Sequence, residues 1–158
     1  MRGATVIVTL SGGELYVGAS VGVARRLSAI RRKRPEVYGA AGPHYWDVDI
    51  EAALAELAVA KALGRYWQSP LLDNVASSTD LRGVNVRHTT LPDGCLILHE
   101  ADPDAIPFVL VRGVSPHFDV AGWCYGSEGK IAALWRNLER PCFMVPASRL
   151  RQIETLAA

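Results

Sequence analysis

The sequence predicts one α/β (α+β) domain, in which a mixed central β-sheet is flanked by helices. Three observations lead to this prediction. The chain has 158 residues, the length of one domain, and 49% of them are hydrophobic and 21% charged, as in ordinary globular proteins. Helix-like segments lie toward both ends of the chain, and strand-like segments lie between them. We expect a single domain over residues 1–158, with an N-terminal strand and helix extension over 1–48 and a core over 49–158.

The first segment of the extension is a short β-branched run over residues 5–10, which is typical of a strand. Ser11 and Glu14 have the spacing of a capping box, which favours a helix from there to about Arg34, where a proline follows. The alternative is a hairpin that turns at the two glycines after Ser11, with a second strand over residues 14–21. The sequence leaves both open.

The second predicted helix runs from about Ile50 to Leu63, with Asp47 or Asp49 as its N-cap and Gly64 as its end. Its interior is apolar on nearly every face and contains one charged residue, Glu56. Such a helix is normally buried, and a buried ionised carboxylate is costly unless it is paired or bound to a metal.

A run of strands and turns fills the rest of the chain. The hairpin signal Pro92-Asp93-Gly94 separates the first two strands, a short helix precedes the last strand, and a terminal helix follows Pro146. The strands are predicted at Val84–Thr90, Cys95–His99, Phe108–Arg112, Phe118–Tyr125 and Cys142–Val145, and the short helix at Ser127–Asn137.

Apolar runs, cysteines and motifs in the sequence argue against a membrane protein, a secreted protein and several common enzyme classes. No apolar run approaches the roughly 18 residues that span a membrane, and no secretory signal is visible. The three cysteines are far apart and are expected to be reduced thiols, which suits a soluble cytoplasmic protein. No phosphate-binding P-loop, dinucleotide-binding glycine motif or hydrolase nucleophile elbow is present in the sequence.

Four residues form the candidate catalytic set: Glu56, Asp80, Asn85 and Arg87. Residues 85 and 87 share one face of a strand. Oxygen ligands from Glu56, Asp80 and Asn85 suit a Mg²⁺ or Mn²⁺ ion, and a cation at Arg87 suits the charge of a phosphodiester. Each residue also has a structural interpretation: a carboxylate paired with an arginine for Glu56, a turn former for Asp80, and a solvent-facing strand for the other two.

At these residues the chain resembles the PD-(D/E)XK nuclease superfamily, and more closely small phage-encoded proteins of that kind. The resemblance implies a restriction-endonuclease-like core over 49–158, with Glu56 as the helix glutamate and Asp80 as the motif aspartate. Asn85 stands where that motif has Asp or Glu, and Arg87 stands where it has Lys. The similar segments are Glu51–Gly64, Tyr66–Trp67, Asp80–Arg87, Phe108–Gly113, Val120–Trp123 and Val145–Leu150.

A basic run provides a candidate DNA-binding surface, although the net charge of the chain is only +1. It could contact several phosphates if its members share a face, and the alternative is the solvated end of a helix. The run places six cations in ten residues: Arg25, Arg26, Arg31, Arg32, Lys33 and Arg34.

The expected function is therefore metal-dependent hydrolysis of DNA by a phage-type nuclease, weakened by Asn85 and Arg87, with Mg²⁺ or Mn²⁺ as cofactor. The alternative is a catalytically inactive nuclease fold that acts as a DNA-binding or host-protein-binding module. The expected location is the cytoplasm, which is that of the host cell if a phage encodes the protein. We expect no membrane partner, and a dimer is among the oligomeric states that the sequence leaves open.

Overall fold

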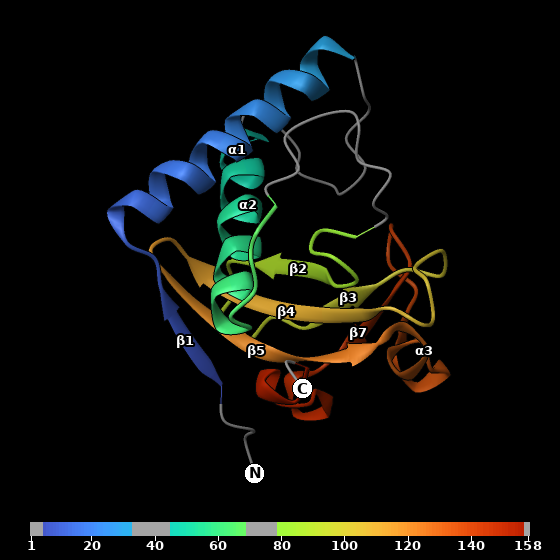
Figure 1. Cartoon of the computed structure of the whole chain (residues 1–158). Coiled ribbons are helices and arrows are strands. Elements are labelled where there is room, and N and C mark those ends of the chain that lie inside the picture. The colour runs from blue at the N-terminus through green and yellow to red at the C-terminus, as the bar shows by residue number, and fades with distance from the viewer. Residues whose placement is uncertain (1–4, 33–44, 69–78, 157–158) are drawn as a thin grey trace.

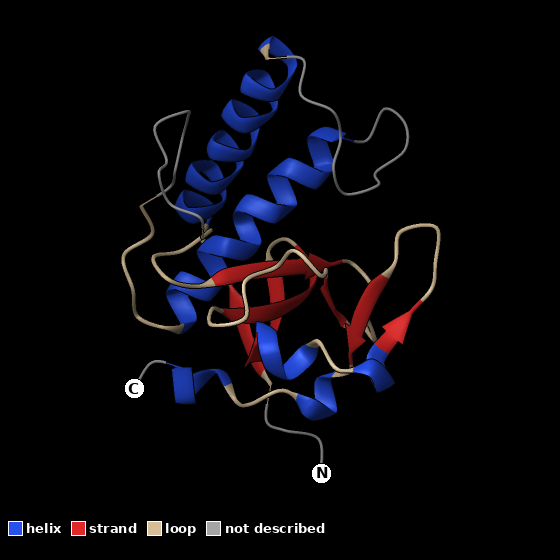
Figure 2. Ribbon diagram, turned by 90° about the vertical axis from the view of Figure 1, so that its right-hand side faces the viewer, coloured by secondary structure: helices blue, strands red, loops and turns tan. Residues whose placement is uncertain are grey.

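Two long helices lie over one face of a mixed sheet in the computed structural model, which describes residues 5–32, 45–68 and 79–156 (Figure 1). The helices are α1 (Gly12–Arg31) and α2 (Tyr45–Ala62). A second, smaller sheet and several short helical turns lie on the other side of the main sheet (Figure 2). This mixed arrangement confirms the expected α/β class in its general form.

The main sheet has the order β1-β5-β4-β2, and the smaller sheet has the order β3-β7-β6. In the main sheet β2 and β4 are parallel, whereas the other neighbours are antiparallel, so the predicted mixed sheet is confirmed. The strands are β1 (Val6–Thr9), β2 (Asn85–Thr89), β3 (Leu96–Leu98), β4 (Pro107–Val114), β5 (His117–Tyr125), β6 (Trp135–Arg136) and β7 (Cys142–Val145).

Helix α1 begins with the capping box that the sequence predicts. The Ser11 hydroxyl accepts a hydrogen bond from the Glu14 N–H at 3.3 Å, and the Ser11 N–H donates to the Glu14 carboxylate at 2.7 Å. These bonds satisfy backbone groups that a helix start leaves open. The alternative of a hairpin at this point is therefore wrong. Lys33, Arg34 and the proline after them lie outside the described residues.

Helix α2 includes Tyr45, well before the predicted start, so the prediction that Asp47 or Asp49 caps it is wrong. Asp47 lies within the first turn, where a negative charge is stabilised by the helix dipole, and Asp49 follows in the next turn. The Asp49 carboxylate also accepts a hydrogen bond from Arg26 Nε at 2.6 Å. The predicted end is confirmed, since Gly64 adopts the left-handed conformation with φ of 61°.

Three predictions in the second half of the chain are wrong. Strands β2 and β3 belong to different sheets, so the turn at residues 92–94 does not close a hairpin. Residues 127–137 form α3 (Gly126–Gly129), a 3₁₀ turn and β6 instead of one helix, because Trp135 and Arg136 pair with β7. The expected terminal helix is replaced by two 3₁₀ turns, at Ala147–Arg149 and Ile153–Leu156.

The core has two parts, one on each face of the main sheet. Helix α2 lies between α1 and the sheet, and Ala53, Ala55 and Ala58 on it are fully buried. The second part lies between the two sheets and contains Leu96, Phe108 and their neighbours. The expectation that α2 is buried is thus confirmed. In the described part of the chain, no helix is long and apolar enough to cross a membrane.

Candidate functional site

The polar centre of the molecule lies where α1 crosses α2. Arg25 of α1 donates two hydrogen bonds to the two carboxylate oxygens of Glu56, at 2.6 and 2.8 Å. Trp67 Nε1 lies 3.4 Å from Glu56 Oε2 and also donates to it. The Glu56 side chain is only 6% exposed. Of the two interpretations that the sequence offered for Glu56, the carboxylate paired with an arginine is the arrangement observed.

Asp80 and Asn85 lie in a tight turn that leads into β2. The Asp80 carboxylate accepts the Val86 N–H at 2.8 Å, and the Asn85 carbonyl oxygen accepts the Asp80 N–H at 3.3 Å. Gly83 permits this turn because its φ is 78°. Both polar side chains therefore hold the backbone of the turn, which is the structural role expected of an aspartate before a glycine.

Electrostatic interactions connect this turn with Glu56. Burial raises the pKa of Glu56 to about 7; Arg25 lowers this pKa and the charge of Asp80 raises it. Burial also raises the pKa of Asp80, while the Val86 N–H, Arg87 and Arg25 lower it. The two carboxylates thus repel each other, and Arg25 stabilises the ionised form of both.

Arg87 points toward the smaller sheet. Its guanidinium donates to Asp102 Oδ1 at 2.8 Å and to the Ile97 carbonyl at 3.4 Å. It also lies over the Phe108 ring, 5.2 Å from the ring centroid. Arg87 is close enough to lower the pKa of Asp80, but Asp102 is its direct carboxylate partner. The four predicted residues share one neighbourhood without converging on one point.

The basic run is divided between the interior and the surface. Arg25 pairs with Glu56, and Arg26, whose side chain is 7% exposed, pairs with Asp49. The interpretation of the run as one DNA-binding surface therefore needs correction at Arg25 and Arg26, which face α2. Arg31 and Arg32 are exposed at the C-terminal end of α1, and Lys33 and Arg34 lie outside the described residues.

The predicted metal ligands do not fit an ion as they are arranged. Both Glu56 oxygens are bound by Arg25, and Asp80 Oδ2 and Asn85 Oδ1 each accept a backbone N–H group. Among residues 5–32, 45–68 and 79–156, no group of three or more His, Cys, Asp or Glu side chains could hold a metal ion. A Mg²⁺ or Mn²⁺ site needs several oxygen atoms that point to one position.

Sequence reasoning missed that Arg25 is the partner of Glu56. A signal for this pairing exists in α1, because Gly18 and Gly22 mark one side of the helix at a spacing of four residues. Small residues at this spacing allow another helix to approach closely, and Arg25 and Arg26 follow one turn later on the same side. This pattern places both arginines against α2.

Comparison of the chain with protein-family models, with curated proteins and with solved structures finds no match.

Proposed function

We propose that this protein is a non-catalytic DNA-binding module built on a nuclease-like core. The observation that carries the proposal is the two-point hydrogen bonding of Arg25 to Glu56. Two buried carboxylates close to each other require a positive charge. Arg25 supplies this charge from within the chain, and in doing so it binds the oxygens that a metal-dependent nuclease would offer to an ion.

Several features support the nuclease-like core. The buried helix α2 carries Glu56 and packs against the main sheet, whose strand β2 carries Asn85 and Arg87. Asp80 lies in the turn that leads into this strand. A helix with a glutamate, a turn with an aspartate and a strand with two polar residues follow one another in the order that the resemblance to PD-(D/E)XK nucleases implies. This order supports the proposal that such a core is present at residues 49–158.

Binding to DNA is supported by the end of α1. This helix extends beyond the main sheet, and its C-terminal end carries the exposed Arg31 and Arg32 (Figure 1). Two further cations, Lys33 and Arg34, follow directly in the sequence. Neighbouring exposed cations contact phosphates and release counterions, which gives affinity for DNA without sequence preference.

Metal-dependent hydrolysis of DNA is the second candidate, and one specific observation favours it. Burial raises the pKa values of Glu56 and Asp80, and the charge of Asp80 raises the pKa of Glu56 further. Such coupled carboxylates are frequent in catalytic centres. The arrangement of the oxygens described above argues for the non-catalytic module instead.

The proposal predicts a salt-dependent affinity for duplex DNA that depends on the end of α1. The double variant Arg31→Ala, Arg32→Ala should reduce the slope of log affinity against log salt by about two units, since each lost phosphate contact removes about one. Fluorescence anisotropy of a labelled duplex at several salt concentrations measures this slope.

The matched control is Arg140→Ala, Arg149→Ala, which removes the same charge from the C-terminal part of the chain and should leave the slope unchanged. Absence of DNA binding at low salt would overturn the proposal and point to a protein partner. Cleavage of DNA with Mg²⁺ or Mn²⁺ that Glu56→Gln abolishes would establish the second candidate.

A further inference from the structure

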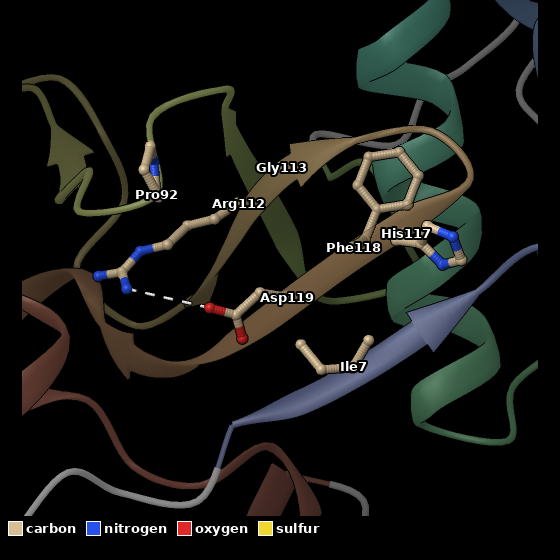
Figure 3. Close-up of a pocket in the computed structure, with 7 residues that line it drawn as sticks. All are labelled: Ile7, Pro92, Arg112, Gly113, His117, Phe118 and Asp119. Atoms are coloured by element: carbon tan, nitrogen blue, oxygen red, sulfur yellow. Dashed lines mark ion pairs between the residues drawn. The ribbon is translucent and has the colours of Figure 1, made fainter.

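A pocket of about 170 Å³ lies on the main sheet, centred on strands β4 and β5 (Figure 3). Ile7, Asp119 and Arg112 form a row across three neighbouring strands, because Asp119 is paired with Ile7 on one side and with Arg112 on the other. Val120 next to Asp119 packs into the core beneath α2. Since side chains alternate along a strand, the row faces away from α2 and from Glu56. The pocket is therefore separate from the polar centre.

The charged pair in this pocket is incomplete. Arg112 Nη1 and Asp119 Oδ2 are 3.9 Å apart, which is too long for a hydrogen bond. Asp119 Oδ1 is buried and has no hydrogen-bond partner. Such a carboxylate oxygen is unfavourable unless a donor reaches it. The guanidinium is held in place by a different bond, from Arg112 Nε to the Gly94 carbonyl at 3.0 Å.

The walls of the pocket are mainly apolar. The exposed Ile7 and Pro92 line it, whereas the Phe118 ring turns to the other face of the sheet, into the core beneath α2. Ile7 is 64% exposed, so the pocket opens to solvent on that side. His117 is held by a contact of 2.9 Å between its Nδ1 and the Thr9 hydroxyl. A flat ring can cover these apolar surfaces while its edge meets the charged pair, a combination that is typical of small-molecule sites.

We propose that this pocket binds a guanine base. Guanine carries acceptors at O6 and N7 and donors at N1 and N2 along neighbouring positions of its edge. Arg112 would donate to O6 and N7, the pairing that arginine commonly makes with guanine, and Asp119 Oδ2, the oxygen that faces Arg112, would accept from the neighbouring N1–H.

The size and the charge pattern both favour this class of ligand. A cavity of about 150 Å³ holds a benzene ring, so the present pocket holds most of a purine while the sugar remains in solvent. Adenine has no ring N1–H donor for Asp119, because its N1 is an acceptor, and its edge has no carbonyl for Arg112. The base can belong to a free nucleotide or to an unpaired position in a nucleic acid strand. The inference stands without the proposed function, because the pocket shares no residue with the Glu56 centre or with the end of α1.

The test is a titration of the ¹⁵N-labelled protein with guanosine monophosphate, followed by NMR. We expect chemical-shift changes at the amides of Gly113, His117 and Asp119, and weaker binding of adenosine monophosphate. The variant Asp119→Asn should weaken the binding of guanosine monophosphate by about tenfold or more, since it removes a charged acceptor. Arg112→Lys keeps the charge but loses the two-point geometry, and it should weaken binding to a similar degree.

Asp93→Asn is the matched control, because it removes the same charge from the exposed loop next to Pro92 and should leave binding unchanged. A short oligothymidine strand with one central guanine distinguishes the sources of the base. Tighter binding of this strand than of the nucleotide identifies an unpaired base, and the reverse identifies a free nucleotide. No shifts in the pocket, equal binding of both nucleotides, or unchanged binding by Asp119→Asn would each overturn the proposal.

Discussion

Replacing Arg25 with methionine is expected to lower the free energy of unfolding by about 3–5 kcal/mol, the usual range when one partner of a buried ion pair is removed. Glu56, whose side chain is 6% exposed in the pair, would lose both hydrogen bonds from Arg25. Trp67 would remain as a donor to it, at 3.4 Å. Urea denaturation at pH 7 measures the loss, and the double variant Arg25→Met, Glu56→Gln should recover most of it, because no buried charge is then left unpaired.

The same variant should change how stability depends on pH. Burial raises the pKa of Glu56 from its ordinary value of 4.5 to about 7, so the folded protein holds this proton more tightly than the unfolded chain. Stability is therefore lost as pH rises from 4.5 to 7. Without Arg25 the pKa of Glu56 rises further, and the loss should continue above pH 7. Equal stability and an equal pH profile in the wild type and Arg25→Met would show that the pair does not form.

Gly22→Ala is expected to destabilise the protein by about 1–3 kcal/mol, as overpacking of a core does. A Cβ atom at this position would lie 2.5 Å from the Ile50 Cα and 2.8 Å from the Asp49 carbonyl oxygen. Both are backbone atoms of α2, so the two helices would have to separate. Their separation would also disturb the pairs Arg25–Glu56 and Arg26–Asp49, which link the same helices. Thermal and urea denaturation measure the effect.

Gly13→Ala is the matched control on the same helix. Apart from its chain neighbours and the backbone of its own helix, no atom lies within 4 Å of a Cβ at this position, and alanine has a higher helix propensity than glycine. This variant should therefore be as stable as the wild type or more stable. If Gly22→Ala were stabilised by the same amount, the close approach of α1 and α2 would be contradicted.

The sequence predicts those parts of the fold that depend on local signals. The capping box at Ser11, the glycine end of α2 and the last strand over residues 142–145 are all found where they were expected. The apolar interior of α2 also predicted that Glu56 is buried. Each of these features is determined by a few residues that are close together in the sequence, and the tertiary contacts favour the same local structure.

The parts that were missed depend on contacts between distant segments. The turn at Pro92-Asp93-Gly94 has the residues of a hairpin, but β3 pairs with β7 because Leu96 and Val145 belong to the core between the sheets. The partner of Glu56 lies 31 residues away on another helix. Gly18 and Gly22 mark the side of α1 that meets α2, but they do not predict which residue of α2 Arg25 reaches. For the same reason, a strand period of two could place Asn85 and Arg87 on one face but could not predict that Arg87 pairs with Asp102.

The central claim is that Arg25, rather than a metal ion, provides the positive charge at Glu56 and Asp80. Titration of the protein with Mn²⁺, followed by electron paramagnetic resonance, tests this claim most directly. We predict that the wild type leaves the Mn²⁺ signal as it is in free solution, and that Glu56→Gln and Asp80→Asn give the same result. Binding of Mn²⁺ by the wild type that both variants abolish would contradict the claim and would place an ion where the structure has the Arg25 guanidinium.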